Sequence, residues 1–303
     1  MAAPDIAGLR TVIHYMGDDE DRRRLRNIAY RLLGSVDDAE DVVQETYLRW
    51  HRLDDQSRRE IRSPRAWMTQ VATRICYDHL GSARVRRESY VGSWLPDPVP
   101  SEPPAQVVDP ADRVTLDESV RMALLVLLET MTPAERVALV LHDVFGMPYA
   151  EIARTVGRTP QACRQLASSA RKRIKAARTA ATSRDEHERI VAAFVRACAD
   201  GNLDALAAVL APDVVATTDS GGKVPSARRP VAGAARVAQL MLGIATLHRS
   251  ATFEVTTVNG LPGIVAYEDG RVVAVSGVDV AGGLVTQLWI VTNPDKLTHW
   301  QAG

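Results

Sequence analysis

The chain has 303 residues, of which 46% are hydrophobic and 24% charged, with 37 basic and 37 acidic side chains. At about 150 residues per domain, this length predicts two or three domains, and the apolar content excludes global disorder. The longest apolar run, Met122–Leu128, is far shorter than the roughly 18 residues of a membrane-spanning helix, and no apolar signal core follows Met1. We therefore expect a cytoplasmic protein with no membrane partner.

The three cysteines, Cys76, Cys163 and Cys198, lie far apart in the sequence. An odd number of cysteines without CxxC or Cys/His spacing is typical of free thiols in a reducing compartment. No His/Asp spacing indicates a catalytic dyad. The sequence thus predicts no metal, no cofactor and no enzymatic activity.

Residues 1–92 show helical periodicity. Apolar side chains recur at helical spacing within Leu25–Leu33, Val42–Trp50 and Trp67–Tyr77. Ser63 followed by Pro64 is a good helix start, because serine caps the first amides and proline suits the first helical position. We expect a bundle of three or more helices in this first domain.

Residues 93–117 form a predicted linker. Six prolines occur between Ser93 and Arg113, and acidic residues outnumber basic ones. Proline fixes φ and removes an amide donor, so we expect this linker to be extended and semi-rigid. Its carboxylates are available to a basic neighbour.

Residues 118–182 contain the most basic part of the chain. Nine Lys or Arg and no Asp or Glu occur between Ile152 and Arg184, although the net charge of the whole chain is zero. Such a cluster creates a local field suited to phosphate groups. The sequence predicts a helix over Pro148–Val156, a turn at Gly157 and a second helix that begins at Thr159-Pro160.

This spacing is typical of a helix-turn-helix motif. The outer face of the second helix carries glutamine and arginine, which pair with adenine and guanine in the major groove. We expect DNA binding by Thr159, Gln161, Arg164, Gln165, Ser168, Arg171 and Lys172. An ordinary pair of helices with a solvated basic face is the alternative interpretation.

Residues 186–303 have a different pattern. Two helical stretches, Ile190–Ala199 and Leu203–Leu210, precede short β-rich runs separated by Gly, Asn and Pro turn signals. The runs are Val214–Thr218, Phe253–Val258, Ile264–Tyr267, Val272–Val280 and Leu284–Thr292. Helices followed by a mostly antiparallel sheet predict an α+β domain.

The order of these segments resembles the extracytoplasmic-function (ECF) sigma factors of bacterial RNA polymerase. Asp38–Trp50 is similar to their region 2.2, Ser63–Leu80 to regions 2.3 and 2.4, and Pro148–Lys175 to region 4.2. The resemblance implies polymerase contacts at Asp38, Asp41, Gln44 and Glu45, and minus-ten promoter contacts at Trp67, Arg74, Tyr77, Arg84, Arg86 and Arg87. It assigns the minus-thirty-five element to the outer face of the helix-turn-helix. The spacing of Trp67 with Val71 and Ile75 nevertheless favours a core position for that ring.

Three pentapeptides are similar to signatures of the ECF subgroup that carries a SnoaL-like, NTF2-fold domain. They are WLPDP at Trp94–Pro98, DSGGK at Asp219–Lys223 and NPDKL at Asn293–Leu297. The resemblance implies that this domain controls the sigma domains in cis. The implied regulatory residues are Trp94, Leu95, Pro96, Asp97, Pro98, Asp219, Gly221, Gly222, Lys223, Asn293, Pro294, Asp295, Lys296 and Leu297. We expect Lys223 and Lys296 to pair with acidic linker residues such as Asp97.

The predicted protein is multidomain: two all-α sigma domains joined by a proline-rich linker, followed by an α+β NTF2-like cone domain at residues 186–303. The predicted function is promoter-directed transcription initiation by a monomer whose partners are core RNA polymerase and promoter DNA. One alternative is a DNA-binding regulator whose C-terminal domain senses a small molecule, and another is a SnoaL-like isomerase with a helical appendage. Whether a small ligand enters the C-terminal pocket stays open at this point.

Overall fold

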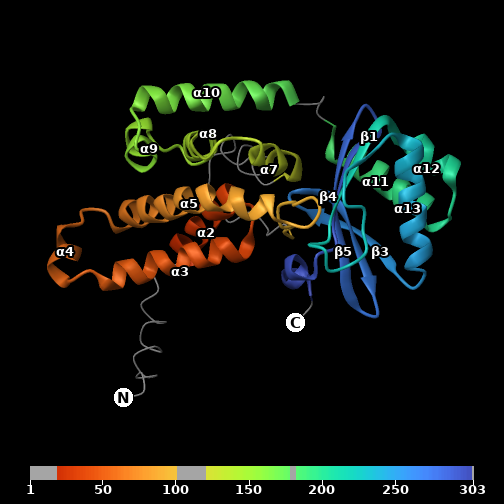
Figure 1. Cartoon of the computed structure of the whole chain (residues 1–303), viewed down its shortest axis with the longest axis horizontal. Coiled ribbons are helices and arrows are strands. Elements are labelled where there is room, and N and C mark those ends of the chain that lie inside the picture. Colours follow the sequence, from red (N-terminus) through yellow and green to blue (C-terminus); the bar gives the residue numbers. More distant parts are fainter. Residues whose placement is uncertain (1–18, 101–120, 178–181, 302–303) are drawn as a thin grey trace, which may run out of the picture. The chain divides into compact units, whose positions relative to one another are not determined.

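The computed structural model describes residues 19–100, 121–177 and 182–301, apart from the side chains of residues 83–88 (Figure 1). The chain divides into two compact units. The first unit comprises residues 1–83 and 132–170, and the second comprises residues 84–131 and 171–303. Among the described residues, no helix is long and apolar enough to cross a membrane.

The described elements of the first unit are helical. They are α2 (Asp19–Leu33), α3 (Val36–Arg52), α4 (Asp55–Glu60), α5 (Pro64–Glu88), α8 (Pro133–Leu139), the π-helical turn η1 (Val140–Val144), α9 (Tyr149–Val156) and α10 (Pro160–Ala177). Both α5 and α10 continue past the boundary of the unit.

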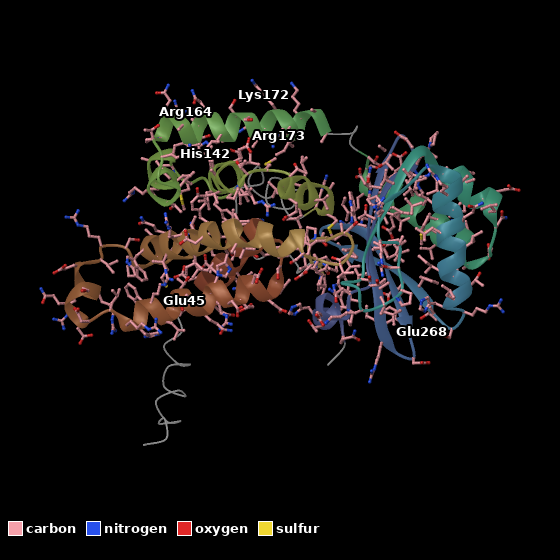
Figure 2. All side chains as sticks on the ribbon, viewed as in Figure 1. Glu45, His142, Arg164, Lys172, Arg173 and Glu268 are labelled. Carbon is pink, nitrogen blue, oxygen red and sulfur yellow. The ribbon has the colours of Figure 1, made fainter. Side chains whose placement is uncertain are left out.

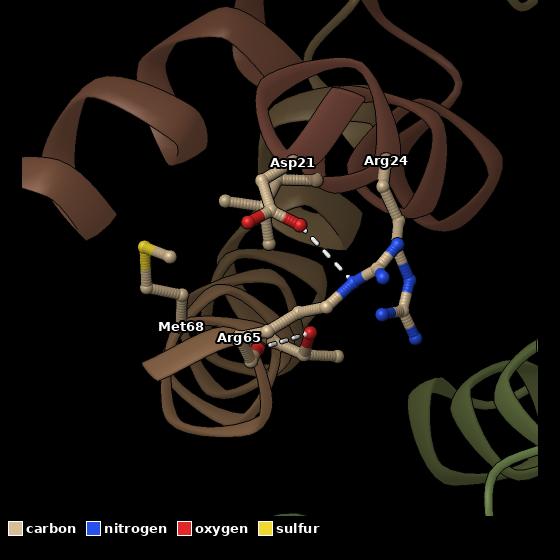
Figure 3. A pocket seen from close by; sticks show the side chains of 6 residues that line it. Asp21, Arg24, Arg65 and Met68 are labelled. Atoms are coloured by element: carbon tan, nitrogen blue, oxygen red, sulfur yellow. Dashed lines mark hydrogen bonds and ion pairs between the residues drawn. The ribbon is translucent and has the colours of Figure 1, made fainter. Parts of the chain in front are cut away.

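Local signals in the sequence explain where these helices start. Ser35 precedes α3, and its hydroxyl accepts a hydrogen bond from the Asp38 amide at 3.3 Å. Arg65 in the first turn of α5 forms an ion pair with Asp21 of α2 at 3.0 Å, across a small hollow that Met68 also lines (Figure 3). The start of α5 is therefore tied to the start of α2.

The second unit contains the α+β fold that the sequence predicts for residues 186–303, and it also includes residues 84–100 and 121–131, which precede the predicted domain. Its helices are α7 (Met122–Glu129), α11 (Arg184–Ala199), α12 (Leu203–Val209), α13 (Ala234–Leu247) and the 3₁₀ helix η2 (Pro294–Trp300). Its strands are β1 (Leu210–Asp219), β2 (Val231–Ala232), β3 (Thr252–Val258), β4 (Leu261–Glu268), β5 (Arg271–Ala281) and β6 (Leu284–Val291).

The six strands form one sheet in the order β2-β1-β6-β5-β4-β3. Only the β1–β6 pair among them is parallel, and the other pairs are antiparallel. Helices α11 and α13 pack against the sheet (Figure 1). The expectation of a mostly antiparallel sheet after two helices is confirmed.

Both faces of this sheet are covered with apolar side chains. Successive residues of a strand point to opposite faces. Leu288 belongs to the core that contains Phe194 of α11, whereas its neighbour Trp289 belongs to a second core with Leu95 and Leu297. The proline-rich segment before residue 100 is therefore part of the second core.

The structure also contains elements that the sequence did not predict. Helix α13 was missed because its segment is apolar on nearly every side, which hides the helical period. The short elements α4 and β2 were missed as well. Helix α11 begins at Arg184, six residues before the predicted Ile190, because the Ser183 hydroxyl caps it at Glu186.

Candidate nucleic-acid interface

The helix-turn-helix motif is formed by α9 and α10. Helix α9 ends at Gly157, whose φ of 69° lies in the left-handed region that favours glycine. The Thr159 hydroxyl then accepts a hydrogen bond from the Ala162 amide at 3.2 Å and caps α10. Cys163 and Ala167 are buried on the inner side of α10. The turn and the start of the second helix lie where the sequence places them.

The outer face of α10 is exposed along its length. Its exposed residues, with the cap, are Thr159, Gln161, Arg164, Gln165, Ser168, Arg171 and Lys172. Figure 2 shows Arg164 and Lys172 on the outer side of this helix. Arg173 instead donates a hydrogen bond to the carbonyl oxygen of Thr130 at 3.5 Å. The predicted DNA-binding side chains therefore do not pack into the interior of the protein.

A second candidate surface lies on α3. Asp41 and Gln44 are exposed, and Glu45 accepts a hydrogen bond from Arg49 at 2.8 Å. Leu48 is 50% exposed and follows Gln44 and Glu45 by four and three residues, so it lies on the same side of the helix. Leu48 was not predicted from the sequence, although its position relative to Gln44 was a usable signal.

The aromatic residues of α5 are half-buried. The Trp67 ring lies 5.3 Å from the Trp50 ring, centre to centre, with a 60° angle between the planes. Tyr77 lies under the guanidinium of Arg74, at 5.9 Å. Arg74 also donates a hydrogen bond to the Thr155 carbonyl at 2.9 Å. The predicted contacts Arg84, Arg86 and Arg87 lie outside the residues whose side chains are described.

A third cluster forms around Asp219 at the end of β1. The Asp219 side chain is fully buried, and its carboxylate accepts hydrogen bonds from the Tyr90 hydroxyl at 2.6 Å and from the Leu95 amide at 2.8 Å. Lys296 donates a third at 2.9 Å and also donates to the Leu95 carbonyl. We call Tyr90, Leu95, Asp97, Asp219 and Lys296 the linker cluster. Burial and the nearby Asp219 carboxylate raise the pKa of Tyr90.

The Lys296 side chain is 10% exposed and is surrounded by linker residues. Its ammonium lies 3.6 Å from Asp97 and 4.2 Å from the centre of the Trp94 ring. A buried cation is stable only with such partners. The expected pairing of Lys296 with Asp97 is present, and Lys223 pairs with Asp295.

Further contacts hold the described part of the linker, up to residue 100, along the sheet. Trp300 donates its indole hydrogen to the Pro98 carbonyl at 2.8 Å, and Asn259 and Val99 exchange two hydrogen bonds. Gly221 has a φ of +58°, and a Cβ added there would lie 2.6 Å from the Asn293 amide nitrogen. Tyr90, Asn259 and Trp300 were not predicted from the sequence, because no local signal marks a contact between residues 129 to 202 positions apart.

Comparisons with known proteins agree with this geometry. The family model of Sigma-70 region 2 matches residues 19–86, and that of Sigma-70, region 4 matches residues 121–174. The chain is 41% identical over 291 residues to the ECF RNA polymerase sigma factor SigJ of Mycobacterium tuberculosis, covering 91% of each chain. It is 37% identical over 289 residues to the probable ECF sigma factor SigI of the same species, covering 93% of each.

The chain belongs to the ECF sigma factors.

A solved structure supports the same conclusion for the fold. The crystal structure of SigJ superposes with a TM-score of 0.71 at 37% sequence identity, covering 92% of this chain and 96% of that one. This ECF sigma factor therefore directs RNA polymerase to promoters, with α2 to α5 as region 2 and α7 to α10 as region 4. The α+β domain that follows is the SnoaL-like domain of its subgroup. Among the described residues, no group of three His, Cys, Asp or Glu is arranged to hold a metal ion.

Proposed function

We propose that this ECF sigma factor reads the minus-thirty-five element with the outer face of α10 and the minus-ten element with α5. The observation that carries this proposal is the exposure of every predicted minus-thirty-five contact on the acid-free outer face of α10. Arginine and glutamine on such a face supply base-specific contacts of about 1–3 kcal/mol each, and the remaining cations bind phosphate. Arg164→Ala/Arg171→Ala should therefore weaken promoter binding and reduce its salt dependence, and unchanged binding in a salt titration would contradict the assignment.

We infer that core polymerase binds region 2 through α3. The predicted contacts there are Asp38, Asp41, Gln44 and Glu45, and the exposed Leu48 adds an apolar anchor among them. Acidic side chains at the centre of an interface act mainly through complementary charge on the partner. Replacing these acidic residues with lysine should therefore weaken polymerase binding more than replacing them with alanine.

The variant Asp41→Lys/Glu45→Lys tests this surface. We expect its affinity for purified core polymerase to fall at least tenfold, because two attractive contacts become repulsive. The matched control is Asp55→Lys/Glu60→Lys, which reverses two exposed charges on α4. Normal polymerase capture by the α3 variant, or equal loss in the control, contradicts the assignment.

We propose that the SnoaL-like domain controls transcription in cis by holding the linker through the linker cluster. Support comes from the Lys296 ammonium, which bonds to Asp219 of the domain and contacts Leu95 and Asp97 of the linker. This contact requires a positively charged group at residue 296, because the carboxylates of Asp219 and Asp97 are both buried and need a cation as partner. Weakening the contacts of the linker cluster should change how the linker connects regions 2 and 4.

The substitution Lys296→Met tests cis control, because it keeps the apolar stem and removes the charge. We expect promoter-dependent transcription in vitro to change several-fold, and removal of residues 186–303 to change it in the same direction. Lys223→Met is the matched control, since Lys223 pairs with Asp295 outside the linker. Unchanged activity, polymerase affinity and region placement after domain removal would exclude control in cis.

The proposal includes no covalent chemistry. The fully buried carboxylate of the SnoaL-like domain, Asp219, is occupied by linker and lysine donors and does not act as a base. We propose a non-enzymatic cytoplasmic initiation factor that works as a monomer with core polymerase and promoter DNA. No turnover is expected in screens of substrates for SnoaL-like enzymes.

A further inference from the structure

Arg164, a predicted minus-thirty-five contact, lies over an aromatic ring. Its guanidinium carbon is 5.6 Å from the centre of the ring of Tyr149, the first residue of α9. Arg164 itself lies in the second turn of α10, on the outer side of that helix (Figure 2). The contact therefore spans the turn at Gly157 and joins the two helices of the helix-turn-helix. Arginine stacks on such a ring through a cation–π interaction.

A second ring packs against Tyr149. The imidazole of His142 on η1 stacks on the Tyr149 ring, with the ring centres 3.9 Å apart and an angle of 22° between the planes. The His142 Nδ1 atom lies 3.0 Å from the carbonyl oxygen of Met147. A carbonyl oxygen only accepts hydrogen bonds, so Nδ1 carries the hydrogen and this bond fixes the orientation of the imidazole. The Met147 amide in turn donates to the Leu141 carbonyl at 2.9 Å, which closes the loop before α9.

This aromatic stack, which we define as His142, Tyr149 and Arg164, restricts the guanidinium before DNA is bound. A free arginine side chain loses rotamer entropy when a contact immobilises it. Contact with a ring whose own position is fixed removes part of that loss in advance. At an exposed site, a cation–π contact shifts such an equilibrium about two- to fivefold. Stacking uses the face of the guanidinium, whereas its N–H donors lie in its plane, so the donors remain available.

The position of Arg164 along α10 favours a base over a phosphate as its target. In helix-turn-helix proteins, the N-terminal residues of the second helix contact base edges in the major groove. Arg164 is the first cation of α10, whereas Arg171 and Lys172 lie two turns further along. A planar guanidinium fits the N7 and O6 acceptors of guanine, and such a bidentate contact discriminates between bases about 5- to 150-fold.

We propose that Arg164 is the specificity-determining cation of the helix-turn-helix, that it reads a guanine of the minus-thirty-five element, and that Tyr149 is its positioning residue. His142 acts through Tyr149. The aromatic stack presents the guanidinium to the groove in one orientation, so that a wrong base leaves its donors unpaired. This inference rests on the proposed function, because it assigns roles within the same DNA-binding face.

Competition among promoter duplexes tests the aromatic stack. The full chain, assembled with core polymerase, is offered duplexes that carry each base pair in turn at every minus-thirty-five position, and their relative affinities are measured. We expect wild type to prefer G·C at least about fivefold at one position, and Arg164→Lys to lose this preference. Arg164→Lys keeps the charge but not the planar fork, so the salt dependence of binding should not change.

The variant Tyr149→Leu tests the positioning role. It should reduce the G·C preference at that same position about two- to fivefold, without changing the other positions or the salt dependence, because no charge is removed. Tyr149→Phe is the matched control, since it keeps the ring and should keep the preference. In the Arg164→Lys background, Tyr149→Leu should have no further effect on the preference, because the two residues act as one unit. His142→Leu covers the case in which Tyr149→Leu does not fold, and it should act at the same position in the same direction.

Some results would overturn the roles of these residues alone. A uniform loss of affinity for all duplexes in folded Tyr149→Leu would assign a structural role to Tyr149. An unchanged preference in both Tyr149→Leu and His142→Leu, or a G·C preference that persists in Arg164→Lys, would exclude the aromatic stack as a determinant of specificity, while recognition by α10 would stand. If wild type showed no sequence preference at any minus-thirty-five position, the proposed function itself would fail.

Discussion

The substitution Asp219→Ala perturbs the linker cluster at its centre. The Asp219 carboxylate is fully buried and accepts hydrogen bonds from Tyr90, Leu95, Gly221 and Lys296. Removing one member of a buried ion pair costs about 3–5 kcal/mol, because the other charge stays buried. Asp97 remains 3.6 Å from the lysine, so we take the lower end, about 3 kcal/mol. That value corresponds to a roughly 150-fold increase in the population with a released linker.

Amide hydrogen exchange measures this release residue by residue. The Leu95 amide loses its own acceptor in the variant, so its faster exchange alone is weak support. The Asn259 amide is the informative probe, because it donates to the Val99 carbonyl at 2.9 Å and does not touch Asp219. We expect exchange at Asn259 to accelerate about 100-fold, since the linker should leave the sheet as one piece.

The matched control is Asp213→Ala, an exposed aspartate on the same strand. It should leave exchange at Asn259 within a factor of three of wild type. Faster exchange at Leu95 with no change at Asn259 would refute the reasoning, because the cluster would then be a local contact that does not hold the linker.

Gly221→Ala should lower the free energy of unfolding by about 1–3 kcal/mol, because residue 221 has a φ of +58° and an added Cβ would meet Asn293. Gly243 lies on α13 in open space, so Gly243→Ala should raise the free energy of unfolding by about 0.5–1 kcal/mol. Urea titrations measure both changes. Leu48→Ala should weaken the binding of core polymerase by about 1–2 kcal/mol and change the free energy of unfolding by less than about 0.5 kcal/mol. If the variant lowered only the free energy of unfolding, Leu48 would be excluded as an anchor for the polymerase. Burial lowers the pKa of His187, so the unfolded state binds this proton more readily and stability should fall as pH drops through about 6.5. In His187→Gln this part of the pH dependence should disappear from thermal melts, and an unchanged profile would assign it to another group.

The helix-turn-helix could be predicted because its signals are local. Gly157, Thr159 and Pro160 mark a turn and a helix start within four residues, and the structure uses each of them in that role. The residues on the outer face of α10 could be predicted directly from helical periodicity. In contrast, α13 gave no periodic signal because apolar residues occupy most of its sides.

The linker cluster could be located but not assembled from sequence. Its pentapeptides marked the segments, and the opposite charges of Asp97 and Lys296 suggested one pairing. The role of Tyr90 depends on the tertiary fold, which brings its hydroxyl to an aspartate 129 residues away. The pairing of Lys223 with Asp295 was not foreseen for the same reason, since these two residues become neighbours only after folding.

The most direct test of the central claim is promoter opening by purified protein with core polymerase, followed by permanganate footprinting across a promoter library. Wild type should open a defined set of promoters that share a minus-thirty-five sequence. Arg164→Ala/Arg171→Ala should lose that preference and show a weaker salt dependence of binding, while Arg173→Ala, whose side chain contacts the Thr130 carbonyl, should retain the preference. Opening of the same promoters at the same salt concentrations by the double variant would contradict the account.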